Sequence, residues 1–436
     1  MKISALKLHS IAIADPPLRS SYGLHAPWAL RTIVQLETDD GFTGISETYG
    51  GDGPRAALEE AREHLIGMDP FRLAGLYLQM NRERDKGGDV PGGRSQTWLV
   101  PGENPLDRHN RTFAAIEIAC LDIIGKAVNR AVCDVLGGRV RDAVPFSAYL
   151  FYKHGGGGGD GRYEDKYGEV LDAAATVREC RQMIDEYGFR EIKLKGGVLE
   201  PALEIETMKA LRDAFGSAVP LRIDPNCAWS VDTSVAVGLS LRQELAGGGY
   251  LEDPCAALEG MGEVRRRLLA KDIDTPLASN VAVTSFGDVP RARDLDAVQI
   301  VLSDPHYWGG MRQVQYLSHL CQTLGMGLSM HSNSHLGISM MAMTHVAAAC
   351  PNLTYACDTH YPWQTEKDEV IAGGRVRFRE GSIAIPDKPG LGVELDYDQL
   401  ARGRERYDRI PLRKRDDEAE MRKHVDPNWK RVLPRW

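Results

Sequence analysis

The chain has 436 residues, 43% of them hydrophobic and 26% charged, and a formal net charge of −8 at pH 7. This composition is typical of a globular protein, the length predicts two domains, and the acidic balance argues against nucleic-acid binding. The eight cysteines are scattered without a CxxC pair, and the longest apolar stretch, around residues 337–350, is too short to span a bilayer. We therefore expect a cytoplasmic enzyme with buried free thiols and no membrane partner.

The first third of the chain predicts an α+β domain. KISALKLHSIAI, from residue 2, and RTIVQLETDDGFTGISETY, from residue 31, alternate as strands do, with a hairpin turn at residues 39–41. Lys7 and His9 interrupt the first apolar run and argue against a signal peptide. Helical patterns follow near residues 54–66, 71–83 and 112–136, and the Gly/Pro-rich loops 20–29 and 87–105 are typical of active-site lids.

Short apolar runs, each ended by a polar residue, recur from residue 144 onward at intervals of about one strand–helix unit. Residues 144–151 and 353–359 supply the first and last runs, and the polar endings are Lys195 in EIKLKGG, Asp224 in LRIDPN, Glu252 in GYLEDP, Asn280 in TPLASN, Asp304 in IVLSDP and His331 in LSMHSN. Such a repeat predicts an α/β fold of the (β/α)₈ TIM-barrel type. Chemistry on that fold lies at the carboxyl ends of the strands.

Two lysines and three oxygen donors stand at these strand ends. Lys193 and Lys195 alternate with apolar residues, so both should point into the barrel mouth and need carboxylate partners. Asp224, Glu252 and Asn280 follow on successive strands and form the oxygen set that Mg²⁺ prefers. Glu259 is a competing second carboxylate after Glu252.

His331 and Asp304 end neighbouring strands, and a carboxylate beside a histidine sets its tautomer and raises its basicity. A zinc site at His331 and His335 is the weaker interpretation, because Gly337 breaks any helix there. A lysine and a histidine facing each other across a metal suit proton abstraction next to a carboxylate. Lys193 and the metal would then stabilise the negative charge that develops.

These motifs resemble the enolase superfamily, which uses a Lys or His base with Mg²⁺, and within it the glucarate dehydratase family. The similar stretches are KLKGGVL (193–199), DPNCAWS (224–230), EDPC (252–255), DPHYW (304–308), HSNSH (331–335), DTHYPW (358–363) and KPGLGVELD (388–396). The resemblance implies a modified (β/α)₇β barrel at residues 139–385. It also implies an N-terminal α+β capping domain at residues 1–138, completed by residues 386–436.

The resemblance also implies residue roles. Asp224 and Asn280 become metal ligands, with Glu259 between them, although spacing alone favours Glu252. His331 and Lys195 become the bases, assisted by Asp304 and Lys193. Implied substrate contacts are His25, Thr97, Tyr149, Lys193, Asn226, Asn333, His360 and Arg415; a guanidinium such as that of Arg415 suits a remote carboxylate.

The implied activity is Mg²⁺-dependent dehydration of a dicarboxylate sugar acid, D-glucarate, to a keto-deoxy acid by a homo-oligomer. A dehydratase or an epimerase for another acid sugar is an alternative, because an epimerase needs no acid for a leaving hydroxyl. A near-inactive paralogue is a further alternative, although every ligand and base position is occupied by a suitable residue.

Overall fold

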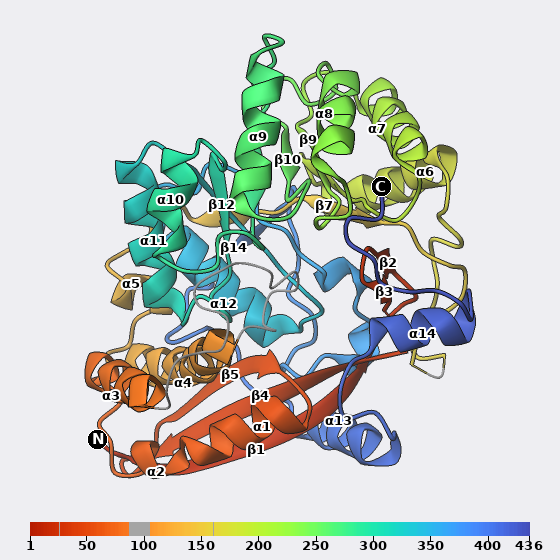
Figure 1. Ribbon diagram of the computed structural model, residues 1–436. Helices are drawn as coiled ribbons and strands as arrows, with labels where there is room; N and C mark the ends of the chain where they lie inside the picture. The colour runs from red at the N-terminus through yellow and green to blue at the C-terminus, as the bar shows by residue number, and fades with distance from the viewer. Residues whose placement is uncertain (26, 87–104, 160) are drawn as a thin grey trace.

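The N-terminal part of the fold is built on a three-stranded antiparallel sheet. In the computed structural model, which describes residues 1–25, 27–86, 105–159 and 161–436, the sheet order is β1–β4–β5. The strands are β1 (Ile3–Ala14), β4 (Trp28–Thr38) and β5 (Thr43–Tyr49). The predicted meander and its hairpin are confirmed, and Figure 1 shows this sheet below the barrel.

Helices follow this sheet in the chain. They are α1 (Asp52–Glu60), α2 (Arg62–Leu65), α3 (Leu73–Lys86), α4 (Pro105–Ala127) and α5 (Val132–Val135), and α4 packs on β4 and β5. The single helix expected up to residue 136 is interrupted after Ala127. Asn129 there has φ 55°, a left-handed conformation that ends a helix and that Asn tolerates better than most residues.

The second part is a parallel barrel in chain order. Its strands are β7 (Ala148–Phe151), β8 (Ile192–Lys195), β9 (Leu221–Asp224), β10 (Tyr250–Glu252), β11 (Leu277–Ser279), β12 (Ile300–Ser303) and β13 (Gly327–Met330), and each pairs with the next. Residues 353–357 close the ring through parallel bridges from Leu353 to Leu328 and from Cys357 to Phe146. The predicted TIM-barrel fold is confirmed.

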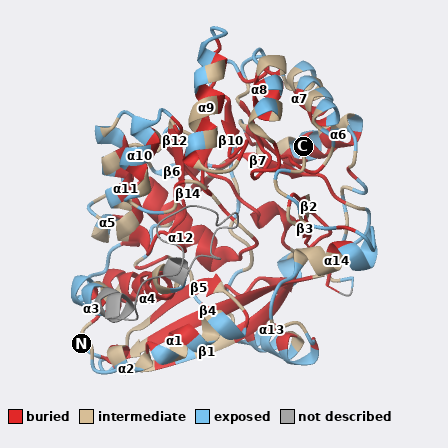
Figure 2. Cartoon of the chain, viewed as in Figure 1, coloured by how far each residue is buried: buried red, intermediate tan, exposed pale blue. Residues whose placement is uncertain are grey.

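One helix follows each barrel strand. They are α6 (Ala173–Tyr187), α7 (Pro201–Phe215), α8 (Val231–Ser240), α9 (Leu258–Leu269), α10 (Asp288–Asp294), α11 (Met311–Thr323) and α12 (Gly337–Ala348). Every residue of α12 is buried, whereas the outer helices show exposed faces (Figure 2). Helix α12 contacts β5 and therefore lies between the barrel and the N-terminal sheet, which explains why it is apolar all round.

The C-terminal segment runs back over both parts. Strand β14 (Ser382–Ala384) pairs with β6 (Ala143–Pro145), α13 (Tyr397–Arg409) packs on β1, and α14 (Asp417–His424) packs on β3 (Gly23–Leu24), which pairs with β2 (Arg19–Ser20). The final residues return to the barrel, where the N–H groups of Arg435 and Trp436 donate to the carbonyl of Ala228. Short 3₁₀ turns span Tyr361–Trp363 and Glu366–Asp368. In the described part of the chain, no helix has the length and apolarity needed to cross a membrane.

Candidate active site

The two strand-end lysines are held by carboxylates of neighbouring strands. Lys195 Nζ lies 2.6 Å from Oδ2 of Asp224. Lys193 Nζ lies 2.5 Å from Oε2 of Glu252 and 2.6 Å from Oδ2 of Asp358. All five side chains are buried. The alternation of strand β8 therefore brings both lysines to carboxylates, as the sequence predicted.

Burial and neighbouring charges have opposite effects on the pKa values of these buried groups. Burial tends to raise the pKa of Asp224, but the ammonium groups of Lys195 and Lys193 outweigh it and hold that pKa below its usual value. Burial, with the charge of Asp224 next, raises the pKa of Glu252 well above its usual value. Burial would lower the pKa of Lys193, yet Asp358 and Glu252 keep it above its ordinary value. Such crowding of carboxylates favours a bound cation.

Buried oxygens without hydrogen bonds show where a metal would fit. Oδ1 of Asn280 and both carboxylate oxygens of Glu252 accept no hydrogen bond, although Glu252 keeps its ion pair with Lys193. Asn280 is held by its backbone N–H, which donates to Oδ2 of Asp253 at 2.9 Å. Unused acceptors of this kind fit a hard cation. Among the described residues no three His, Cys, Asp or Glu side chains form a metal site on their own, so the candidate set of Asp224, Glu252 and Asn280 depends on its amide.

Glu259 lies outside this set. It belongs to the first turn of α9, where its side chain is 55% exposed and pairs with Arg291 of α10. The chain leaves β10 at Glu252, turns over residues 253–257 and begins the helix at Leu258, which carries Glu259 away to the surface. Of the two glutamates left open by the sequence, the structure brings only Glu252 to the lysines, and the choice between them as metal ligand stays a prediction.

Asp304 has a histidine on each carboxylate oxygen. His331 Nδ1 lies 3.1 Å from Oδ2, as the predicted dyad requires. His306 Nδ1 lies 2.7 Å from Oδ1. Burial would raise the pKa of Asp304, but His306 and then His331 hold it far below its usual value. The zinc alternative finds no support in the described residues, because no three His, Cys, Asp or Glu side chains are grouped there as a zinc site requires, and Nε2 of His335 faces Oγ1 of Thr359 at 3.4 Å.

An aromatic wall stands beside Lys193. Its Nζ is 4.9 Å from the centre of the Tyr149 ring, which meets the His360 ring edge-on at 5.0 Å. His360 in turn stacks with His25 at 6.4 Å and shares a hydrogen bond of 2.9 Å between Nδ1 and Ser332 Oγ. Three of the residues expected to contact substrate therefore lie side by side.

Two asparagines of the expected substrate set differ in their contacts. Asn333 donates through Nδ2 to Tyr49 Oη at 2.6 Å and accepts from Arg31 at 3.3 Å, so it joins the barrel to the N-terminal sheet. Asn226 donates its backbone N–H to Asp224 at 2.9 Å, while its own Oδ1 is buried without a hydrogen bond. Its amide is therefore available to a ligand.

Arg415 reaches His25 from the C-terminal segment. Its guanidinium donates to both oxygens of Asp417, at 2.5 and 2.7 Å, and lies 3.9 Å from Asp15. His25 is 3.8 Å from each of these carboxylates, and burial lowers its pKa to about 3. Thr97, the remaining expected contact, lies outside the described residues.

Sequence reasoning missed two residues of the site. Asp358 holds Lys193, and it follows the eighth barrel segment just as the other polar endings follow theirs, which was an available signal. His306 holds Asp304 from the loop after β12, and no spacing rule marks it.

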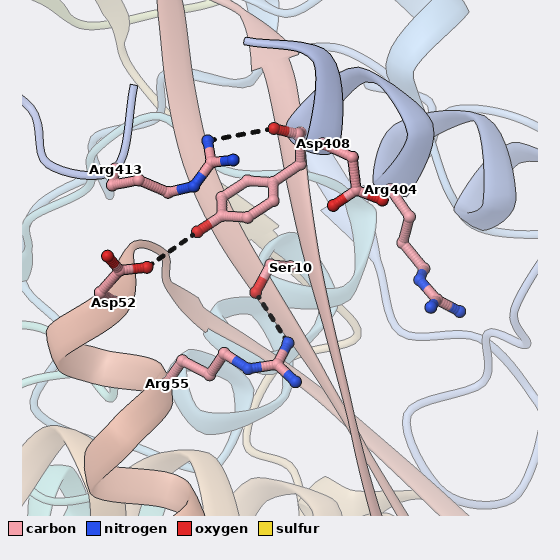
Figure 3. A pocket seen from close by; sticks show the side chains of 7 residues that line it. Ser10, Asp52, Arg55, Arg404, Asp408 and Arg413 are labelled. Carbon is pink, nitrogen blue, oxygen red and sulfur yellow. Dashed lines mark hydrogen bonds between the residues drawn. The ribbon is translucent and has the colours of Figure 1, made fainter. Parts of the chain in front are cut away.

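A surface cavity of about 390 Å³ lies elsewhere, between α1, β1 and α13, and none of the expected site residues lines it (Figure 3). Its lining residues are Ser10, Asp52, Arg55, Arg404, Tyr407, Asp408 and Arg413. Arg55 donates to Ser10 Oγ, Tyr407 donates to Asp52, and Arg413 donates to the carbonyl of Tyr407. These contacts join α13 to the N-terminal part.

Two family models match the chain. The family model described as "Enolase C-terminal domain-like" matches residues 175–400, and that of the "Mandelate racemase / muconate lactonizing enzyme, N-terminal domain" matches residues 17–137. The chain belongs to the enolase superfamily.

Individual relatives are similar over their whole length. A probable glucarate dehydratase of Streptomyces coelicolor is 43% identical over 100% of this chain and 99% of its own. An enolase of Pseudomonas fluorescens, solved with bound magnesium, potassium and tartrate, has 44% identity and a TM-score of 0.92, with 100% and 99% of the two chains covered. A Thermobispora bispora enolase complexed with magnesium and formate has 46% identity and a TM-score of 0.90, with both chains fully covered.

Proposed function

We propose that this enolase-superfamily enzyme is a hydro-lyase that dehydrates a six-carbon aldarate, D-glucarate first among them, to a keto-deoxy acid. The observation that carries the proposal is the presence of two separately held bases at the barrel mouth, His331 on Asp304 and Lys195 on Asp224. The 43% identity with a probable glucarate dehydratase supports the same reaction class.

The metal of the proposal is Mg²⁺. Asp224, Glu252 and Asn280 would hold it, and magnesium is bound in two similar solved structures. When bound, Mg²⁺ supplies Lewis-acid polarisation of a substrate carboxylate, which makes the neighbouring C–H more acidic.

Side chains of the protein then carry out the proton transfers and stabilise the charge that develops. Because Nδ1 of His331 is turned to Asp304, its Nε2 is the free acceptor for the proton next to the carboxylate. Lys193, cationic between Glu252 and Asp358, stabilises the negative charge left by that proton. The protonated His331 returns the proton to the departing hydroxyl, the C–O bond breaks as a C=C bond forms, and the released enol tautomerises to the keto acid. Lys195 would take the same role for the opposite epimer.

The distal carboxylate of an aldarate suits Arg415 and His25. The guanidinium of Arg415 already presents two parallel N–H groups to a carboxylate, that of Asp417. A substrate carboxylate that replaces Asp417 on Arg415 would receive the same bidentate geometry.

The test is a screen of aldarates and aldonates for keto-acid formation with Mg²⁺-loaded protein, after EDTA treatment, and after Mg²⁺ is restored. We expect keto acid from D-glucarate, loss of activity with EDTA and recovery with Mg²⁺, without a need for Zn²⁺. Epimerised substrate without keto acid would indicate an epimerase. Full activity in metal-free protein would contradict the metal assignment, and a metal-binding protein that turns over no acid sugar would contradict the function.

A further inference from the structure

The second histidine on Asp304 belongs to a chain of hydrogen bonds that the proposed mechanism does not use. Besides His306 Nδ1 at 2.7 Å, Oδ1 of Asp304 also receives the backbone N–H of His306 at 2.8 Å. Asp304 and His306 are only 1% and 4% exposed. His331 is therefore left with the other oxygen, Oδ2, alone.

The series of hydrogen bonds continues from His306 to the N-terminal sheet. Nε2 of His306 lies 2.8 Å from Oγ of Ser339, in the first turn of α12. Arg31 of β4 lies 3.4 Å from the same Oγ through Nη2. Glu47 of β5 accepts the backbone N–H of Ser339 at 3.0 Å and Nε of Arg31 at 2.7 Å. Strands β4 and β5 thus reach the dyad through one serine and one histidine.

One direction of hydrogen bonding gives every group in this hydrogen-bond chain a partner. Arg31 can only donate, so Ser339 Oγ accepts from it and can give its own proton to Nε2 of His306. In this arrangement His306 accepts at Nε2 and donates its Nδ1–H to Asp304.

We propose that His306 is a positioning residue for the base His331: it holds one oxygen of Asp304, orients the other toward His331, and ties this geometry through Ser339 to Arg31 and Glu47 of the N-terminal sheet. His306 and His331 thereby share the carboxylate of Asp304, one on each oxygen. The kinetic reading of this inference rests on the proposed function.

Other titratable and charged groups face the residues of this hydrogen-bond series and must be considered in any pH experiment. Arg31 and Glu47 come from the N-terminal sheet, Tyr49 and Tyr307 interact with Asp304, His335 interacts with His306, and His360 interacts with His331. A change at His306 or Ser339 leaves these groups in place.

The test uses two substitutions with opposite expected signs. In His306→Phe, Asp304 has one imidazole instead of two, so the pKa of His331 should rise by roughly one unit. In Ser339→Ala, Nε2 of His306 loses its proton donor and becomes free to protonate. The positive charge of His306 would then compete for Asp304, and the pKa of His331 should fall. His306→Asn, which keeps a donor to Oδ1, should stay close to wild type.

The readout is NMR titration of ¹⁵N-histidine-labelled protein with and without Mg²⁺, with the His331 signal identified by its loss in His331→Gln. The acid limb of the kcat/KM profile should move in the same directions. Ser318→Ala is the matched control, because Ser318 is a buried serine of α11 that takes no part in these hydrogen bonds. It should change neither the pKa of His331 nor the acid limb of the kcat/KM profile.

Shifts of one sign in both variants, or no shift in either, would overturn the inference, because a purely structural role moves both alike. If His306→Phe does not fold, an unchanged pKa of His331 in Ser339→Ala overturns it alone. The titration needs no substrate, so it decides the role of His306 even if no aldarate is turned over.

Discussion

Glu252 and Glu259, although close in the sequence, have opposite environments. Glu252 is fully buried beside Lys193 with both oxygens free of hydrogen bonds, whereas Glu259 is exposed beside Arg291. Glu252→Gln should weaken Mg²⁺ binding at least about tenfold, or about 1.4 kcal/mol, because the amide removes one negative charge from the ligand set. Calorimetric titration with Mg²⁺ measures this.

Glu259→Gln is the matched control, since an exposed ion pair contributes little. It should bind Mg²⁺ as wild type does. The opposite ranking of the two variants would show that the loop rearranges around the metal and that Glu259 is the ligand.

The two proposed bases should be separable by the proton that each one exchanges. His331→Ala should lose roughly 10² to 10⁴ in turnover of D-glucarate, the usual contribution of a general base. It should still exchange the corresponding proton of the opposite epimer with D₂O, because Lys195 remains. Lys195→Ala should lose the exchange of the opposite epimer and keep that of D-glucarate. Asp304→Asn should lower the turnover that depends on His331 while Mg²⁺ binding is retained.

NMR of substrate incubated in D₂O with each of these three variants measures which proton is exchanged. Equal loss of both exchanges in each single variant, or wild-type turnover in His331→Ala, would refute the assignment of two opposed bases.

At the scale of elements, the N-terminal part caps the two helices that follow the dyad. Glu47 accepts the backbone N–H groups of Leu336 and Ser339 at the start of α12. Glu117 of α4 accepts the N–H of Met311, at the start of α11, at 2.5 Å. Side-chain oxygens at helix N-termini satisfy free N–H groups, and an ionised carboxylate such as that of Glu47 also interacts favourably with the helix dipole. The helices after Asp304 and His331 are therefore held from outside the barrel.

Glu117 makes stability depend on pH. Burial raises its pKa from 4.5 to about 8. The folded protein then keeps a proton that the unfolded chain releases, so the free energy of unfolding falls as pH rises from about 4.5 to 8. The loss is at most about 1.4 kcal/mol per pH unit. Glu117→Gln keeps the acceptor without the charge and should remove this slope, so the variant gains stability over wild type at pH 8 but not at pH 5.

Urea unfolding at pH 5 and pH 8 checks this, with Glu60→Gln, at an exposed residue of α1, as the control that should not change the pH dependence. A Glu117→Gln variant that loses stability equally at both pH values would mean that Glu117 is ionised in the folded protein.

Over the whole molecule, the C-terminal segment reaches the residues expected to contact substrate. Arg415 lies between Asp417 and Asp15, next to His25 of the N-terminal part. Arg415→Ala should lower kcat/KM, because loss of a charge-assisted pair with the substrate costs about 1.5–3 kcal/mol of transition-state stabilisation. Lys414→Ala, at the exposed neighbouring residue, should leave kcat/KM unchanged. Steady-state kinetics decide, and an unchanged value in Arg415→Ala would limit the segment to a structural role.

Periodicity in the sequence was enough to predict the barrel and most of the residues at its mouth. Strand alternation and the constant strand–helix interval are local properties, so they place Lys193, Lys195, Asp224 and Asn280 at strand ends without knowledge of the packing. The same reasoning paired His331 with Asp304, because neighbouring strands of a parallel barrel end side by side.

Which side chains meet depends on how distant segments pack against one another. Glu252 rather than Glu259 joins the lysines because α9 begins one residue before Glu259 and carries it outward. Asp358 and His306 join the site, and Arg415 reaches His25, through contacts between segments far apart in the chain. Such contacts depend on where loops and the C-terminal segment fold back, and no local period in the sequence encodes that path.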